Sequence, residues 1–451
     1  MRQTSMLVSV LAIAAAFTVR AQAPHTTASA AVAIPNTLAG RALATWLQTF
    51  NSGDRKELES YYKTYRPDVP VDTVLGFRNE TGGFDLVSIY RSEPRHIEFL
   101  ATDRANHNRS IGELDVNGRH PERVSNIAFV RIAADSKLIG FLIDDGDRAR
   151  VIHAIASKVN QLYVLADTGE KMALDITSKW RHGQYDSITD GDTFAQQLTK
   201  ELQVVSHDKH LSVAFSPIEL PPVGPGPSAS SIARQWAQLQ NENCGFKRIE
   251  WLPGNIGYLR FDVFGDPSVC APTAIAAMGF LANVDAIIFD LRDNHGGSPD
   301  LVTLLESYLF ASPTHLDDFW ARPSGQTSHT WTLANLPGKR LPSVPVYVLT
   351  SHETFSGGEA FAYELQALKR ATVVGEETGG GGHLVRPERV DARFMLLVPS
   401  AEPINPITKT NWEGTGVVPD VKVAAAQALD VAEKLAAAAL AKRRSDQQTT
   451  E

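Results

Sequence analysis

The sequence has few cysteines, and it has neither an excess of positive charge nor a long apolar run in its interior. Only Cys244 and Cys270 occur in 451 residues. In an exported protein they could form a disulfide closing a loop of ~25 residues, adding roughly 3 kcal/mol, or they could remain two partly buried thiols. Neither lies in a neighbourhood typical of a catalytic thiol. The sequence leaves the two alternatives open.

The charge and the hydropathy exclude two classes of partner. The net charge is −8, and the Lys and Arg residues form no stripe, so we expect no nucleic-acid partner. No apolar stretch is long enough to span a bilayer, so we expect no stable membrane insertion. The oligomeric state cannot be read from these patterns.

Residues 1–23 have the organisation of a secretory signal peptide. Arg2 precedes an apolar segment from Leu7 to Phe17, and Ala21-Gln22-Ala23 fits a small-x-small cleavage site. No cysteine follows this site, which argues against a bacterial lipid anchor. We therefore predict a periplasmic or secreted protein.

Residues 36–135 are predicted to form a small α+β domain. Two helical patterns, 38–50 and 55–65, precede four strand-like segments at 84–90, 96–101, 110–116 and 124–132. The segment Phe50-Asn-Ser-Gly-Asp54, which separates the helices, resembles the helix break of nuclear-transport-factor-like folds. No catalytic constellation is evident in this domain.

The remainder of the chain is predicted to form a helical segment and an α/β domain. Residues 147–220 are mainly helical, and a proline-rich linker follows at 221–227. Strands and helices then alternate over 246–424, which implies right-handed crossovers and a mainly parallel sheet. Residues 425–451 form an alanine-rich helix and a tail.

Ser356 lies where a strand gives way to a helix. An apolar, β-branched run from Val344 to Thr350 ends in a short polar loop, and a helix-forming run begins at Gly358. Unpaired N–H groups at a helix N-terminus stabilise a developing oxyanion, and two glycines after the serine allow a substrate to approach. These features suit a nucleophile, although a serine that merely caps a helix would look similar.

A second marked segment runs from Asp290 to Gly297. A buried strand leads into Gly296 and Gly297 and then into a helix with Pro299 near its start. Paired glycines at the end of a strand let backbone N–H groups face a ligand. The segment lacks the Lys-Ser/Thr ending of a phosphate loop. A plain turn is the alternative, and Asp290 with Arg292 is expected to form a structural pair.

A catalytic serine needs a base, and the spacing along the chain does not choose among the histidines. The candidates are His210, His295, His329, His352 and His383. His207 and His210 have the spacing of a metal pair, but no third ligand is evident. We therefore predict neither a metal nor another cofactor.

Several motifs together resemble one serine peptidase family. They are Asp-Leu-Arg-x-Asn-x-Gly-Gly at 290–297, Thr-Phe-Ser-Gly-Gly-Glu at 354–359, Val-Gly-Glu-Glu-Thr at 374–378 and Gly-Val-Val-Pro-Asp at 416–420. From about residue 164 to 421 the chain resembles the family that contains C-terminal processing peptidases, tricorn protease and interphotoreceptor retinoid-binding protein. Two further segments, 208–211 and 405–413, look most like the bacterial retinoid-binding-protein-like branch, which has no PDZ domain. The resemblance implies a crotonase/ClpP-like α/β catalytic domain.

The resemblance also implies roles for individual residues. Ser356 would be the nucleophile, with oxyanion donors from the backbone N–H of Gly357 and of Gly296 or Gly297. The processing peptidases use a lysine as base, but its position here is Gly381. Tricorn-like members instead use a histidine ahead of the sheet, oriented by a glutamate, and these positions match His210 and Glu413. His383 is the alternative base.

Two functions follow from the resemblance. The first is an exported serine peptidase acting on a peptide or protein substrate through an acyl-enzyme, with Ser356, His210 and Glu413. The second is a catalytically inactive binding module for hydrophobic small molecules, because the vertebrate retinoid-binding relatives use the fold in that way. A complete Ser/His/Glu set favours the peptidase.

Overall fold

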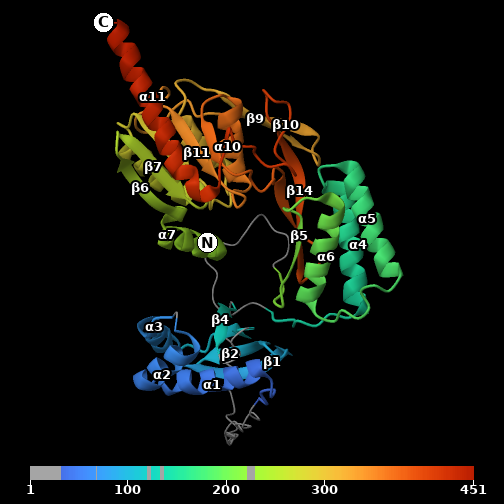
Figure 1. Ribbon diagram of the computed structural model, residues 1–451. Coiled ribbons are helices and arrows are strands. Elements are labelled where there is room, and N and C mark those ends of the chain that lie inside the picture. The colour runs from blue at the N-terminus through green and yellow to red at the C-terminus, as the bar shows by residue number, and fades with distance from the viewer. Residues whose placement is uncertain (1–31, 68, 119–122, 133–136, 221–228, 451) are drawn as a thin grey trace, which may run out of the picture. The chain divides into compact units, whose positions relative to one another are not determined.

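The computed structural model describes residues 32–67, 69–118, 123–132, 137–220 and 229–450 (Figure 1). The expected signal peptide, 1–23, and the expected linker, 221–227, lie outside these described residues. The chain divides into two compact units, residues 1–134 and 135–451. Among the described helices, none combines the length and the apolar character that a membrane span requires.

The first unit packs three helices on an antiparallel sheet. The helices are α1 (Leu38–Ser52), α2 (Arg55–Tyr65) and α3 (Val71–Thr81), and the strands follow in the order β1 (Phe84–Ser92), β2 (His96–Asp103), β3 (Arg109–Val116) and β4 (Val124–Arg131). The helix α3 is additional to the two that the sequence predicted. It buries only Val74 and Thr81 along its length, so its apolar spacing gives little signal.

The second unit begins with three helices that pack on an antiparallel sheet (Figure 1). The helices are α4 (Asp145–Leu162), α5 (Ala166–Arg181) and α6 (Gly191–Ser206). The sheet has the order β10 (Gln326–Trp331), β9 (His315–Ala321), β14 (Phe394–Ile404) and β13 (Leu384–Arg389), and β5 (Ser212–Phe215) also pairs with β14. Only β5 of this sheet was predicted from the sequence.

A six-stranded sheet forms the centre of the second unit. Its order is β15 (Val421–Lys422), β12 (Thr372–Gly375), β11 (Val346–Thr350), β8 (Ala286–Asp290), β7 (Ile256–Phe261) and β6 (Phe246–Leu252). All neighbours are parallel except β6 and β7. The mixed α/β architecture with a mainly parallel sheet therefore agrees with the prediction.

Helices cover both faces of this sheet because successive side chains of a strand point to opposite faces. In β8, Ile287 and Phe289 join a core with α8 (Pro267–Phe280), α9 (Pro299–Ser307) and α10 (Gly357–Ala367). Ala286 and Ile288 face the other way and pack with the alanines of α11 (Ala428–Thr450). Small alanine side chains let α11 approach the sheet closely.

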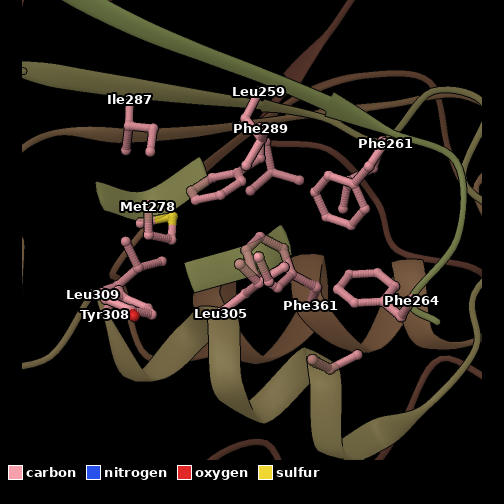
Figure 2. Close-up of a cluster of buried hydrophobic side chains, with 14 of the residues drawn as sticks. Leu259, Phe261, Phe264, Met278, Ile287, Phe289, Leu305, Tyr308, Leu309 and Phe361 are labelled. Carbon is pink, nitrogen blue, oxygen red and sulfur yellow. The ribbon is translucent and has the colours of Figure 1, made fainter. Parts of the chain in front are cut away.

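The core on the first face anchors the helix that follows Ser356. Figure 2 shows Phe361, from α10, among Phe264, Phe289 and Leu305. The ring of Phe361 lies 5.0 Å from that of Phe289 and 5.9 Å from that of Phe264, centroid to centroid. Because α10 is fixed in this way, its first turn is held at the end of β11.

The segment between the expected linker and β7 has regular secondary structure. It contains α7 (Ala229–Asn241), the short 3₁₀ helix η1 (Asn243–Gly245) and β6. Cys244 in η1 and Cys270 in α8 form a disulfide. The structure thus selects the disulfide from the two alternatives that the sequence left open.

Candidate active site

Ser356 occupies a strained turn between β11 and α10. It is the N-cap of α10 and has φ 51° and ψ −118°, a conformation that costs a residue with a side chain on the order of 1–3 kcal/mol. The preceding loop is docked on the end of β8, since Thr354 Oγ1 donates to Leu291 O at 2.8 Å and Phe355 N donates to Asn294 O at 2.9 Å. Neighbouring structure therefore holds the strained serine in place.

Glu359, one turn into α10, fixes this turn to the glycine-rich loop. Its buried carboxylate accepts hydrogen bonds from Ser356 N at 2.8 Å, Gly380 N at 2.6 Å, Gly381 N at 2.8 Å and Thr378 Oγ1 at 2.5 Å. Burial raises the pKa of Glu359, while these four donors favour its charged form. Glu359 thus joins the serine turn to the loop that carries Gly381.

Two backbone N–H groups beside Ser356 have no partner. Gly297 N and Gly357 N donate to no group among the residues that the structure describes. A Cβ at Gly357 would lie 3.1 Å from Gly297 N, so the two backbones pass close together. Gly296 N, by contrast, donates to Asn294 Oδ1 at 2.9 Å. Of the two glycines that the sequence proposed as second oxyanion donor, only Gly297 has a free N–H.

A cavity of ≈360 Å³ opens beside this serine. Ser356, Gly357, His210 and His383 all line it. Its remaining wall is largely apolar, with Val302, Phe319, Leu384, Val385 and Trp412 among its residues. The serine and both candidate bases therefore border one space.

His210 follows α6 and lies next to the serine turn. Its ring centroid is 4.7 Å from that of Phe355, the residue before Ser356. Its Nδ1 atom is buried without a hydrogen-bond partner, and the nearest carboxylate oxygen, Asp208 Oδ1, is 3.9 Å away. Burial lowers the pKa of His210, an effect that Asp208 only partly offsets. The imidazole is therefore neutral near pH 7, the state a general base requires.

Gly381 leaves the space that the His210 ring occupies. A Cβ at Gly381 would lie 2.7 Å from His210 Cε1 and 2.3 Å from Phe355 Cζ, and real Cβ contacts are longer than this. A residue with a side chain, such as lysine, could not stand here without moving the histidine. The absence of the lysine and the presence of the histidine are thus two aspects of one packing arrangement.

Asp208, to which the sequence gave no role, links the two candidate histidines. Its Oδ2 atom bonds His383 Nδ1 at 2.7 Å and accepts from Tyr163 Oη at 3.2 Å, while Oδ1 accepts from His210 N at 2.9 Å. Burial lowers the pKa of His383, but the Asp208 hydrogen bond and the nearby Glu413 outweigh it, so the pKa is raised overall. His383 is therefore the more readily protonated and the less suited to act as base.

Glu413 lies in the same cluster. Its Oε2 atom accepts from Gly382 N at 2.6 Å and His383 N at 3.1 Å, and it is 3.6 Å from His383 Nδ1. Burial raises the pKa of Glu413, and Asp208 adds to the effect. Between these described residues, neither a Ser356–His210 nor a His210–Glu413 side-chain hydrogen bond is formed. The carboxylate nearest to His210 Nδ1 is Asp208.

Two groups of side chains in the described residues have the spacing of metal ligands. One is the Asp208, His210 and Glu413 cluster, and the other is His315, Asp318 and His329 on the β9–β10 hairpin. In the second, Asp318 Oδ1 bonds His315 Nε2 at 2.7 Å and His329 Nδ1 at 2.5 Å, so these three side chains satisfy one another. Asp290, as expected, pairs with Arg292 through bonds of 2.8 and 2.6 Å.

The sequence analysis gave neither Asp208 nor Glu359 a role in the site. Asp208 precedes His210 by two residues, and that proximity was the only available signal. Glu359 belongs to a motif used for the family resemblance, but its four hydrogen bonds join segments that are distant in the chain. Both roles depend on tertiary contacts.

Comparison with known proteins gives two family matches. The family "Peptidase family S41" matches residues 255–423, and "N-terminal domain of Peptidase_S41 in eukaryotic IRBP" matches residues 147–243. The carboxyl-terminal-processing peptidase 2, chloroplastic, of Arabidopsis thaliana is 29% identical over 182 residues, which are 38% of this chain and 34% of that protein. The match thus spans about a third of the length of this relative.

Two solved structures are also similar to the chain. One is the photosystem II D1 C-terminal processing protease, with a TM-score of 0.41 and 15% identity, over 62% of this chain and 93% of that chain. The other is the tricorn protease, with a TM-score of 0.42 and 13% identity, over 80% of this chain and 46% of that chain.

Proposed function

The chain belongs to peptidase family S41, and we propose that it is an exported serine peptidase that hydrolyses peptide bonds through an acyl-enzyme. Ser356 is the nucleophile, His210 the general base, and Gly357 and Gly297 supply the oxyanion donors. The observation that carries the proposal is the strained Ser356 turn, with two free backbone N–H groups beside it and a neutral histidine in the same cavity.

The acylation step follows from this arrangement. Ser356 Oγ attacks the substrate carbonyl carbon and passes its proton to His210. The oxyanion that forms accepts hydrogen bonds from Gly297 N and Gly357 N, which are fixed before substrate arrives. Collapse of this intermediate breaks the C–N bond, and the leaving amine takes the proton from His210. Water then repeats the sequence and releases the acid and Ser356.

The protonated His210 needs a carboxylate to stabilise it. Glu413 is our candidate for the residue that orients His210, and Asp208 shares that role because it is the nearest carboxylate to Nδ1, at 3.9 Å. Catalytic hydrogen bonds are often long in a free enzyme and shorten in the substrate complex. One nitrogen of His210 and one carboxylate oxygen each of Asp208 and Glu413 lie within 4.8 Å of one another, so both carboxylates are close to the imidazole.

Export is supported by two features. The first 23 residues have the organisation of a signal peptide, and the Cys244–Cys270 disulfide is typical of an oxidising compartment. We propose a periplasmic or secreted protein.

A binding module for hydrophobic small molecules is the second candidate. The largely apolar wall of the cavity favours it. The strained serine and the free N–H pair have no use in such a module, whereas each has a role in acyl transfer.

The test compares wild type with Ser356→Ala in the hydrolysis of a fluorescently labelled unfolded protein. We expect Ser356→Ala to abolish hydrolysis with an unchanged melting temperature, and His210→Ala to lower the rate by about two to four orders of magnitude. A His210→Ala variant of normal activity would move the base to His383. Equal hydrolysis by Ser356→Ala would refute the proposal.

A further inference from the structure

Three buried carboxyl groups at one end of the active-site cavity play no part in the chemistry proposed above. They belong to Glu306 on α9, Asp317 on β9 and Glu364 on α10, and are 0%, 0% and 4% exposed. No lysine, arginine or histidine among the described residues forms an ion pair with them. In their ionised forms, both carboxyl oxygens of Glu306 and Oδ2 of Asp317 are buried and receive no hydrogen bond, whereas Asn405 Nδ2 donates to Asp317 Oδ1 at 3.1 Å.

The three groups meet at the wall of the cavity. Ser356, Ala360 and Glu364 follow one another at intervals of four along α10, so they share a face, and all three line the cavity. The Glu364 carboxyl lies within hydrogen-bonding reach of Glu306 and Asp317. The other two acids therefore stand directly behind a cavity-lining carboxyl.

Residues next to Glu306 and Asp317 line the same cavity as Glu364. Thr303 precedes Glu306 by one turn of α9 and lines the cavity. Thr330 is the cross-strand partner of Asp317 and also lines it, as does Phe319, two residues along β9. Residues that oppose each other or alternate along a strand share a face of the sheet. Glu306 and Asp317 thus lie next to residues that line the cavity, while Glu364 lines it itself.

Such a cluster is energetically costly without a counter-charge. Burial raises the pKa of Glu306 and of Glu364, and it raises that of Asp317 to about 7. Removing a carboxylate from water is unfavourable unless it is paired, and like charges close together add to the cost. A cation entering from the cavity would relieve both penalties.

The residues that line the cavity indicate which kind of cation it would bind. Its sides are apolar, with Val302, Phe319 and Val385 among the lining residues, and the carboxyl group is at Glu364. Lysine and arginine combine a long aliphatic stem with a charged end. The cavity is thus complementary to such a side chain and holds ≈360 Å³.

The orientation of α10 fits a substrate side chain attached beside the scissile carbonyl. The carbonyl oxygen would lie at Gly357 N and Gly297 N, at the starts of α10 and α9, and the cavity extends along these helices. Glu364 is two turns from Ser356, about 12 Å along the axis. Helical side chains lean toward the N-terminus, which brings the Glu364 carboxyl closer to the serine.

We propose that this cavity binds the side chain of the residue whose carbonyl is attacked, and that Glu364, backed by Glu306 and Asp317, selects lysine or arginine there. The substrates are then peptides cleaved after a basic residue. This inference rests on the proposed peptidase function.

The test uses acetyl-Ala-Ala-X-aminomethylcoumarin with X as lysine, norleucine or leucine. Norleucine keeps the aliphatic stem of lysine and lacks its charge. We expect kcat/KM for lysine to exceed that for norleucine by about tenfold or more in wild type, and this ratio to fall by about tenfold in Glu364→Gln. Glu306→Gln, which leaves Glu364 in place, should lower it less. Glu170→Gln, at an exposed position of α5, should keep the wild-type ratio.

The outcomes separate this inference from the proposed function. A wild type that cleaves norleucine or leucine peptides as well as lysine peptides refutes the basic subsite and leaves the peptidase standing. An unchanged ratio in both Glu364→Gln and Glu306→Gln refutes the role of the cluster. If Glu364→Gln does not fold, the wild-type series and Glu306→Gln still decide. Failure of every peptide and of the labelled protein would refute the peptidase itself.

Discussion

At the scale of single residues, a glycine decides which base the serine can use. Gly381 stands at the position where the family resemblance led us to look for a lysine, and the His210 and Phe355 rings occupy the space into which a Cβ would project. Which residue can act as the base thus depends on positions 210 and 381 together, and not on either of them alone. The sequence identified both positions, and the packing explains why a side chain at 381 is incompatible with the position of the His210 ring.

Gly381→Ala tests this packing. Its Cβ would lie 2.3 Å from Phe355 Cζ and 2.7 Å from His210 Cε1, so both rings must shift from their positions beside Ser356. We expect kcat/KM to fall by about tenfold to a thousandfold, within the contribution of a general base. The measurement is peptide hydrolysis with circular dichroism as a check of folding.

Gly279→Ala is the matched control for this variant. A Cβ at Gly279, in α8, would have no neighbour within 4 Å, and alanine favours a helix. Its activity should equal that of wild type. A Gly381→Ala enzyme with normal kcat/KM would contradict the account of the base.

At the scale of secondary-structure elements, α9, α10 and β9 bring together carboxyl groups that repel one another. The folded-state pKa values of Glu306, Asp317 and Glu364 are raised, so the folded protein retains protons that the unfolded chain releases. The protonated cluster makes its full contribution to the free energy of unfolding below the pKa values of the unfolded chain, near pH 4. It decreases as the pH rises toward the folded values, about 7 for Asp317.

We therefore expect Glu306→Gln to flatten this part of the pH dependence. The variant should be more stable than wild type at pH 8, by on the order of 1–3 kcal/mol, and the gain should shrink toward pH 4. Urea denaturation at a series of pH values measures it, with Glu170→Gln as the control. A variant that is destabilised by the same amount at every pH would contradict the raised pKa values.

Helices and strands in which buried residues recur at a regular spacing could be predicted from the sequence. The strands β1 to β4 lie within two residues of their predicted bounds, and in β3 buried residues alternate with half-buried ones along the whole strand. The β9, β10, β13 and β14 strands were missed. β10 is polar and largely exposed, and β13 carries Pro387, so neither presents the alternating or continuous apolar pattern of a strand.

The site was predictable in the same uneven way. Ser356, Gly297 and Gly357 lie within local motifs at strand-to-helix turns, where the chain itself defines the geometry. Asp208, Glu359 and the Glu364 cluster act through contacts between segments that are far apart in sequence. No local pattern encodes such contacts, since they are set by how α6, α9 and α10 pack around the sheets.

At the scale of the whole molecule, all the candidate catalytic residues lie in the unit of residues 135–451, and the disulfide supports the same unit. It ties η1, after α7, to α8 and closes a loop with a sequence separation of 26. Replacing both cysteines with serine should lower the free energy of unfolding by about 3 kcal/mol. Thermal denaturation of the purified protein, with and without reductant, measures the effect.

The same protein also tests export. Thiol titration of the unfolded, unreduced protein should find no free cysteine. Two free thiols, or a melting temperature that reductant does not change, would contradict the disulfide and remove one of the two supports for an oxidising compartment.

The most direct test of the central claim is covalent labelling with a fluorophosphonate, followed by mass spectrometry of the labelled peptide. Such probes react with a serine that is activated by a base and faces an oxyanion hole. The account predicts one adduct, on Ser356, that forms much more slowly in His210→Ala and is absent in Ser356→Ala. A folded wild-type protein that acquires no label at Ser356 would contradict it.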